Sequence, residues 1–389
     1  MKRSKIAALL MPLTVIAVLA LVAGSASAAP KPIVIGWAFD AKGNMSPFDG
    51  PALAAATVRV KQVNARGGVG GRPLKIITCD TQNNNPAKSK SCAASLLGQG
   101  ADVIFTTCDV DYGTPAIQEA INAGKLTLSP CVGTDQMGPK RFGAKGKLAF
   151  SFGNVAQDEG SAMAEYAYAR GWKTAATATN TLLAYFKIVV QAFEARFKQL
   201  GGKIVAKESY ATGANNVGTA VSRINAVKAD VYVTVTSFGE LPAFVTGLRS
   251  LDNNTPIFNS WAGDGNYWVP KDGVSNYYAV TYASAFGDDP NNAVNALAKA
   301  VKAGTGGFVT GAAVIDGLVT AINRSGGSTK GSVLAATMEK FTKVPTLSGL
   351  VSFSSAQHSV FGRQYRVIRI EANKPRVVGA VVAKVVPKI

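Results

Sequence analysis

Histidine is almost absent from this chain of 389 residues, which contains only His358. A Ser-His-Asp mechanism needs a histidine buried beside a serine and a carboxylate, whereas His358 lies in a polar stretch where we expect a solvated or turn residue. The sequence also has no Gly-x-Ser-x-Gly nucleophile elbow and no cluster of metal ligands. We therefore expect no enzyme activity, no metal site and no cofactor.

Long apolar runs are also absent, except near the N-terminus, so no other segment is expected to cross a bilayer. Residues 1–28 resemble a secretory signal peptide, in which basic residues precede an apolar stretch that ends at the small-residue site Ala26-Ser27-Ala28. An uncleaved membrane anchor is the alternative, but Pro12 and the small-residue end favour cleavage. Ser25 occupies the place where a lipoprotein signal needs cysteine. We expect an exported, soluble protein without a lipid anchor, periplasmic or otherwise extracytoplasmic.

Acidic residues are few, with 23 against 41 basic residues and a formal charge of +18. The predicted leader holds three basic residues and no acidic ones, so 38 basic and 23 acidic side chains remain after its removal. These basic residues are spread along the chain and no nucleic-acid recognition motif accompanies them, so nucleic acid is not an expected partner. The charge favours solubility and weak attraction to acidic surfaces.

Cysteine is scarce: four residues lie between positions 79 and 131. An even number in an exported chain favours disulfides, and four cysteines permit three pairings. Cys79–Cys92 with Cys108–Cys131 is the preferred pairing, because Cys108 and Cys131 both end strands that are expected to be neighbours. A zinc site is the alternative, and no Cys-x-x-Cys pair or nearby histidine supports it.

Strand-like and helix-like segments alternate along most of the chain, which indicates parallel sheets with helices on both faces. About 361 residues follow the leader, more than one core usually holds, so two domains are expected. In the first series we expect helices over Pro51–Asn64 and, with Thr114 as its N-cap, Pro115–Asn122. Late strands over 351–353, 365–371 and 377–386 are expected at an antiparallel edge.

The most informative stretch, Asn64–Leu74, reads Asn-Ala-Arg-Gly-Gly-Val-Gly-Gly-Arg-Pro-Leu between a predicted helix and a predicted strand. A phosphate-binding loop needs the opposite order, strand before helix. This element closely resembles the periplasmic binding proteins that capture leucine, isoleucine and valine, and the resemblance extends from about Pro32 to about Val386.

The resemblance implies an α/β fold of two doubly wound parallel-sheet lobes joined by a three-strand hinge. Lobe 1 is expected to comprise residues 29–152 and 286–346, and lobe 2 residues 153–285 and 347–389. The chain would cross between lobes near residues 151–153, 284–287 and 347–351. Ligand would bind where the carboxyl ends of both sheets face each other across a cleft.

The resemblance also implies positions for the ligand site. The loop after the fourth strand would hold a ligand carboxylate through backbone groups and a threonine hydroxyl, and Tyr185 and Phe238 would contact the ligand from the second lobe. A turn or N-cap role is an equal alternative for Thr134. An aromatic at the cleft rim maps to Phe48, while Trp37 is as well explained by core packing. The residues of the carboxylate loop are Cys131, Val132, Gly133 and Thr134.

Two positions depart from the family pattern. Asp109-Val110-Asp111 replaces a serine-rich stretch, and these carboxylates would repel an anionic ligand unless they point away or cap the next helix. Trp261 replaces a glutamate that pairs with the ligand ammonium, and Asp264 is the candidate substitute. A branched-chain amino acid is the leading ligand; an aromatic or amide-bearing compound, or one with a cationic end, is the alternative.

The expected function is capture of this ligand for an importer driven by ATP, with its permease and ATPase as partners and the binding protein itself a monomer. A ligand sensor of the same fold that reports to a membrane receptor is the alternative.

Overall fold

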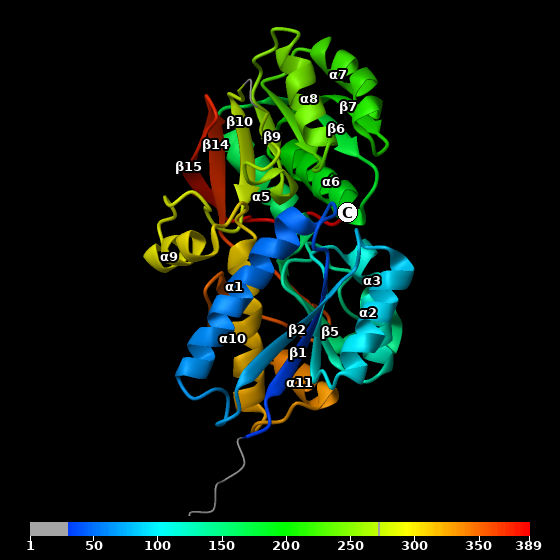
Figure 1. The fold of residues 1–389 in the computed structure, drawn as a ribbon. Helices are drawn as coiled ribbons and strands as arrows, with labels where there is room; N and C mark the ends of the chain where they lie inside the picture. Colours follow the sequence, from blue (N-terminus) through cyan, green and yellow to red (C-terminus); the bar gives the residue numbers. More distant parts are fainter. Residues whose placement is uncertain (1–29, 271–272) are drawn as a thin grey trace, which may run out of the picture.

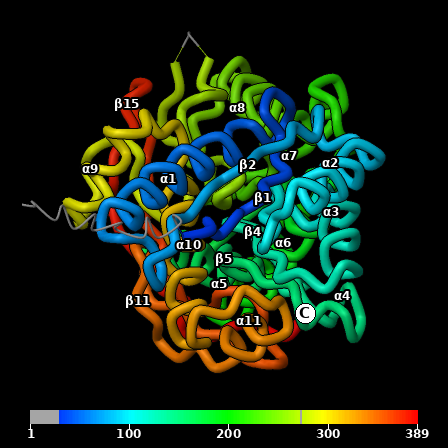
Figure 2. The backbone as a smooth tube through the Cα atoms, turned by 60° about the horizontal axis from the view of Figure 1, so that its bottom comes forward, coloured from blue at the N-terminus to red at the C-terminus, as the bar shows by residue number. Residues whose placement is uncertain are grey.

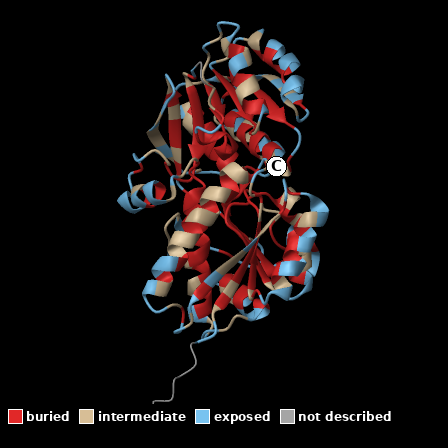
Figure 3. Cartoon of the chain, viewed as in Figure 1, coloured by how far each residue is buried: buried red, intermediate tan, exposed pale blue. Residues whose placement is uncertain are grey.

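The computed structural model describes residues 30–270 and 273–389, so the predicted leader lies outside the described residues. Two lobes lie one above the other (Figure 1). Within the described ranges, no helix is both long enough and apolar enough to span a bilayer. Buried residues fill the centre of each lobe and continue through the junction between them (Figure 3).

The first lobe is built on a parallel sheet with the strand order β13-β5-β4-β3-β1-β2. Its strands are β1 (Ile33–Phe39), β2 (Leu74–Asp80), β3 (Val103–Phe105), β4 (Leu126–Ser129), β5 (Ala149–Asn154) and β13 (Ser359–Val360). Its helices are α1 (Ser46–Ala65), α2 (Pro86–Gly98), α3 (Val110–Asn122), α4 (Pro139–Phe142), α10 (Phe308–Arg324) and α11 (Gly331–Met338), with η1 (Gly143–Leu148). The α1/α10 pair and the α2/α3 pair lie on opposite sides of the strands (Figures 1 and 2).

The second lobe has the strand order β15-β14-β10-β9-β8-β6-β7, parallel from β7 to β10 and antiparallel at β14 and β15. Its strands are β6 (Thr174–Asn180), β7 (Lys203–Tyr210), β8 (Val231–Val235), β9 (Ile257–Asn259), β10 (Tyr277–Thr281), β14 (Tyr365–Glu371) and β15 (Lys374–Val381). Its helices are α5 (Ala156–Ala169), α6 (Ala184–Gln199), α7 (Gly218–Asn225) and α8 (Glu240–Arg249), with η2 (Ala214–Asn216) and η3 (Trp261–Gly263). The antiparallel edge was predicted and is present at β14 and β15, but residues 351–353, also expected there, do not belong to this sheet. The α/β fold of two lobes is confirmed.

Helix α1 begins at Ser46, five residues before its predicted start, and Pro51 lies inside it. A proline within a helix lacks the N–H that would bond to the carbonyl four residues back. That carbonyl, of Pro47, accepts a hydrogen bond from the Thr305 hydroxyl instead, at 3.0 Å. The prediction missed this first turn because a residue 258 positions away in the sequence satisfies it.

Helix α3 also begins a turn earlier than predicted. The Asp109 carboxylate accepts the amides of Asp111 and Tyr112 at 2.8 and 3.1 Å, so Asp109 is the N-cap. Thr114, the predicted cap, lies inside the helix and donates its hydroxyl to the Val110 carbonyl at 2.7 Å. Asp109 therefore takes the capping role that the sequence left open for the two acidic residues.

The third crossing between the lobes differs from its expected position near residues 347–351. The short β11 (Val344–Thr346) and β12 (Gly349–Val351) pair with each other, and β13 still pairs with β5 in the first sheet. The chain therefore enters the second lobe only between β13 and β14. The segment before β13 is held to the first lobe by Phe353 and His358, which both pack on Phe150.

His358 is buried rather than solvated, which corrects the expectation from its polar neighbours. Its ring stacks on Phe150 at 4.0 Å between centroids, and its Nδ1 lies 2.8 Å from the Ala149 carbonyl oxygen. Burial lowers the pKa of His358, which favours the neutral ring in this packing role.

The three crossing segments are connected by polar side chains. Arg363 donates to the Phe152 carbonyl at 2.7 Å, and the Tyr282 hydroxyl accepts the Asn154 amide at 3.3 Å. The Asn154 side chain donates to Asp158 and to the Tyr365 hydroxyl. Each of these hydrogen bonds joins two different crossings, or a crossing and the helix or strand next to it. The hinge segments are therefore held to one another by side-chain hydrogen bonds.

Candidate functional site

A small cavity lies between the lobes, at the carboxyl ends of both sheets. The lobe 1 wall consists of residues that follow β1, β3 and β4, and the lobe 2 wall of residues that follow β6, β8 and β9. The lining residues are Met45, Phe48, Cys108, Asp109, Gly133, Leu183, Tyr185, Phe186, Ser237, Phe238, Trp261 and Ala262. Open α/β sheets bind their ligands at this edge, in the crevice outside the carboxyl ends of the strands where the strand order reverses.

The lobes are closed around this cavity. The Phe48 ring from lobe 1 lies 4.9 Å from the Trp261 ring and 5.9 Å from the Tyr267 ring of lobe 2. The cavity volume is about 20 Å³, little more than one water molecule needs. Any larger ligand therefore has to separate these rings or turn them aside.

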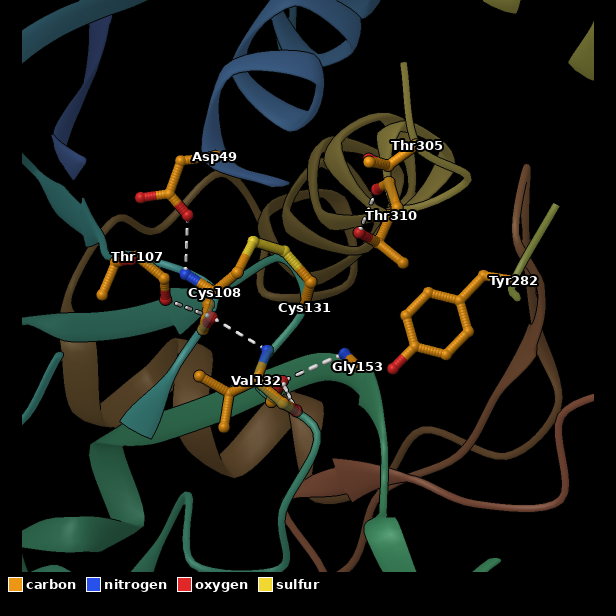
Figure 4. The surroundings of a disulfide bond; sticks show 12 residues. Asp49, Thr107, Cys108, Cys131, Val132, Gly153, Tyr282, Thr305 and Thr310 are labelled. Carbon is orange, nitrogen blue, oxygen red and sulfur yellow. Dashed lines mark hydrogen bonds between the residues drawn. A yellow bond between two sulfur atoms is a disulfide. The ribbon is translucent and has the colours of Figure 1, made fainter. Parts of the chain in front are cut away.

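The lobe 1 wall is held by a disulfide. Cys108 and Cys131 join the ends of β3 and β4 (Figure 4). Cys79–Cys92 ties β2 to α2, so both predicted pairs are confirmed. The Asp49 carboxylate accepts the Cys108 amide at 2.8 Å (Figure 4). Burial raises the pKa of Asp49 to about 7. A backbone donor at the end of β3 is thus already occupied by the chain's own carboxyl group.

The polar groups of the carboxylate loop after β4 also form hydrogen bonds within the protein. The Val132 amide donates to Ser129 Oγ at 3.2 Å, and the Val132 carbonyl accepts the Ser151 hydroxyl at 2.7 Å. Thr134 Oγ1 accepts the Gln136 amide at 3.4 Å, which is the turn role given as the alternative for this residue. Gly133 is the member of this loop that lines the cavity.

Tyr185 covers Gly133 from the opposite lobe. A Cβ atom at position 133 would lie 2.8 Å from the Tyr185 ring, so only glycine permits this approach. The Tyr185 hydroxyl donates to Glu159 Oε1 at 2.8 Å. Tyr185 therefore closes the cavity with its ring and is oriented by a carboxyl group behind it.

Glu159 is a buried carboxyl at the first turn of α5. Its Oε1 also accepts the Trp261 amide at 2.6 Å, while Oε2 has no hydrogen-bond partner among the described residues. Burial, with smaller repulsion from Asp158 and Asp264, raises the pKa of Glu159 to about 8. Sequence reasoning missed this residue; its only signal was an acidic side chain in a helical first turn that follows the first crossing.

Trp261 is the centre of the aromatic wall. Its ring stacks on Tyr282 at 5.1 Å and meets Tyr185 edge-on at 6.4 Å. Trp261 Nε1 is buried without a partner in the described part of the chain. The position where related proteins are expected to carry a glutamate is therefore occupied by a ring that has an unused donor.

Asp111 connects the lobes. Its Oδ2 accepts the amide of Ala184, at the N-terminus of α6, at 2.8 Å, and its Oδ1 accepts from Arg141 at 2.7 Å. The positive end of a helix dipole favours a carboxylate at this point. Asp111 is thus placed to stabilise the closed arrangement of the lobes.

The predicted site residues fall into two groups. Those that line the cavity are Phe48, Gly133, Tyr185, Phe238 and Trp261. Those that lie beside it in structural contacts are Val110, Asp111, Cys131, Val132, Thr134 and Asp264.

Asp264 supports the second crossing. Its Oδ2 accepts the Thr281 hydroxyl at 2.6 Å and the Gly306 amide, and Oδ1 accepts the Gly265 amide at 2.7 Å. Both oxygens are therefore engaged within the protein. Trp37 likewise packs in the lobe 1 core, with its ring 5.1 Å from Phe105.

Several lining residues were not predicted. Each of them lies within a few residues of a predicted one, so the sequence indicated the right segments but not all of their lining residues. The residues missed are Met45, Leu183, Phe186, Ser237 and Ala262. Phe238 has φ +53, a left-handed conformation that a bulky side chain rarely adopts. This backbone holds its ring beside Phe186, 6.4 Å away between centroids. Among the described residues, no group of His, Cys, Asp or Glu is arranged to hold a metal.

Solved structures with this fold are numerous. LivJ from Streptococcus pneumoniae, solved with isoleucine, matches with TM-score 0.77 at 18% identity, covering 90% of this chain and 99% of its own. The leucine-binding protein LivK from Thermotoga maritima matches with TM-score 0.77 at 15% identity, over 90% and 98%. An ABC-transporter solute-binding protein from R. palustris, solved with benzoate, matches with TM-score 0.75 at 20% identity, over 91% and 98%.

A search of curated protein sequences finds no match. The family model for periplasmic binding proteins matches residues 32–375, most of the chain and all but the ends of both lobes. Together with the cleft between two doubly wound sheets, this match shows that the chain belongs to the periplasmic binding protein family, whose members bind solutes and are not enzymes.

Proposed function

We propose that this protein is exported, captures a small ligand with a flat apolar body in the cleft between its lobes, and delivers it to the permease and ATPase of an ABC importer. The observation that carries this proposal is the cavity at the carboxyl ends of both sheets, walled by Phe48, Tyr185, Phe238 and Trp261. Aromatic walls suit a flat apolar ligand, and closure removes that ligand from water. The family membership supports the partnership with an importer.

A branched-chain amino acid is the second candidate ligand. The fold similarity to LivJ bound to isoleucine favours it, whereas the similarity to the benzoate-binding protein favours an aromatic compound. The Cys108 amide already donates to Asp49, and the Val132 amide already donates to Ser129. Fewer backbone donors therefore remain for an amino-acid carboxylate. For this reason we place the aromatic class first.

A thermal-shift screen of the chain from Ala29 onward separates these ligands. The compounds are amino acids, aromatic acids, amides and amines. A ligand at 100 times its dissociation constant stabilises the folded form by about 2.7 kcal/mol if it binds only that form. Small-angle scattering then checks that each active compound alters the lobe arrangement. A protein that no compound stabilises and whose scattering never changes would contradict the proposed function.

Tyr185 provides the residue-level test. Tyr185→Ala removes the ring over Gly133 and is expected to weaken ligand binding about tenfold or more, while the protein remains folded. Tyr185→Phe keeps the ring and loses only the bond to Glu159, so it is the matched control and should bind more tightly than the alanine variant. Calorimetric titration measures both affinities, and equal binding by wild type and Tyr185→Ala would show that this ring is not part of the site.

A further inference from the structure

The charge of the cleft is opposite to that of the whole protein. The chain has a formal charge of +18, yet among the described residues that line the cavity there is no lysine, arginine or histidine. The one charged side chain in the lining is Asp109. A site for an anionic ligand in so basic a protein would be expected to use one of its many basic side chains.

Asp109 keeps part of its carboxylate available. Its Oδ1 accepts two amides at the start of α3, and no described residue pairs with its Oδ2. Arg141 bonds to Asp111 rather than to Asp109. Burial, and then repulsion from Asp111, raises the pKa of Asp109 to about 7, while attraction from Arg141 opposes this rise without a direct bond.

The other walls of the cavity suit a cation. Phe48, Tyr185, Phe238 and Trp261 surround it, and the faces of such rings attract positive charge. Behind Tyr185 and Trp261 lies the second carboxyl group, Glu159, with its Oε2 unpartnered among the described residues. One buried carboxyl group thus faces this small space among the rings, and a second lies behind the aromatic wall.

We propose that the cleft selects an organic ammonium ion with a flat apolar body, whose charged head is bound by Asp109 Oδ2 and whose body lies among Phe48, Tyr185 and Trp261. This inference rests on the proposed solute-binding function and specifies its ligand class. The ammonium N–H groups supply the donors that Asp109 lacks, and the rings hold the apolar part out of water.

The test uses three compounds that share one ring and differ in the charge of the head: benzylamine, benzamide and benzoate. Titration of the wild-type chain at neutral pH should give benzylamine an affinity at least tenfold higher than that of benzamide, and benzoate the weakest binding. Asp109→Asn should remove at least tenfold of the benzylamine affinity. Asparagine is also a good N-cap, so α3 should remain intact in this variant.

Asp252→Asn is the matched control, because it removes the same charge from an exposed turn that precedes β9, away from the carboxyl ends of the strands. It should leave all three affinities unchanged. Tightest binding of benzoate or benzamide, or an Asp109→Asn variant that still prefers benzylamine, would overturn the inference while leaving the solute-binding function in place. Failure of every compound in the wider screen would instead contradict the function itself.

Discussion

At the scale of single residues, the cleft is distinguished by buried carboxyl groups whose ionisation is unfavourable. Burial raises the pKa of Asp49 and Asp109 to about 7 and that of Asp158 and Asp264 to about 6, and Glu159 reaches about 8. Perturbed carboxyl groups gather at functional sites more often than elsewhere. Here they gather at the cleft and at the crossings that open and close it.

Glu159 leads to a prediction about pH. Its pKa is higher in the folded than in the unfolded state, so the folded state holds the proton more tightly and the free energy of unfolding falls as pH rises from about 4 to about 8. Glu159→Gln removes this contribution, up to about 1.4 kcal/mol per pH unit, and should give a variant whose stability depends less on pH. Urea unfolding at pH 5, 7 and 8.5 measures the difference.

The other buried carboxyl groups are present in both proteins, so the difference between wild type and Glu159→Gln measures Glu159 together with its repulsion from Asp158 and Asp264. Glutamine retains an acceptor for the Trp261 amide and the Tyr185 hydroxyl. Stability curves that run parallel across this pH range would mean that Glu159 ionises normally in the folded protein.

At the scale of elements, helices α1 and α10 approach so closely that one position requires glycine. A Cβ atom on Gly311 would lie 1.9 Å from the Ala52 carbonyl oxygen, and a backbone atom cannot move aside cheaply. Both helices begin beside the cleft, and the Thr305 hydroxyl, just before α10, bonds to Pro47 in α1. Their packing therefore sets the position of Phe48 in the site.

Gly311→Ala is expected to lower the free energy of unfolding by about 1–3 kcal/mol, because the helices must separate to admit the methyl group. Gly98→Ala, at the end of α2, is the matched control, since nothing lies within 4 Å of its added Cβ. Alanine there should stabilise the helix by up to about 1 kcal/mol. Urea midpoints measure both changes, and equal midpoints for the two variants would refute this account of the α1/α10 contact.

At the scale of the whole molecule, closure is stabilised by direct contacts between the lobes. Asp111 from lobe 1 bonds to the Ala184 amide of lobe 2, and Phe48 packs on Trp261. A ligand stabilises the closed arrangement only to the extent that it binds that arrangement more tightly than the open one. Contacts that already favour closure raise the apparent affinity, because more of the protein is in the binding-competent state.

Asp111→Asn tests this contribution. A hydrogen bond to a charged group contributes about 1.5–3 kcal/mol, so loss of the charge should shift the lobes toward the open state and weaken ligand binding roughly tenfold. Glu119→Gln, on the same helix but directed to the weak 4.0 Å contact with Lys90, is the control. The radius of gyration from scattering should increase for Asp111→Asn alone; identical values would exclude a closing role for Asp111.

The sequence by itself determined the alternation of strands and helices, the antiparallel edge, the two disulfides and the loops that form the cleft. The alternation and the edge follow from local hydrophobic periodicity and from glycines that end helices. The Cys108–Cys131 pair follows from cysteines at the ends of neighbouring strands and leaves Cys79 for Cys92, while the cleft loops follow from the resemblance to a known family. The tertiary structure alone decided which side chains in those loops meet. Phe48 contacts Trp261, Thr305 completes the first turn of α1, and β13 returns to the first sheet. Each of these contacts joins residues far apart in the chain, and local periodicity contains no information about such pairs.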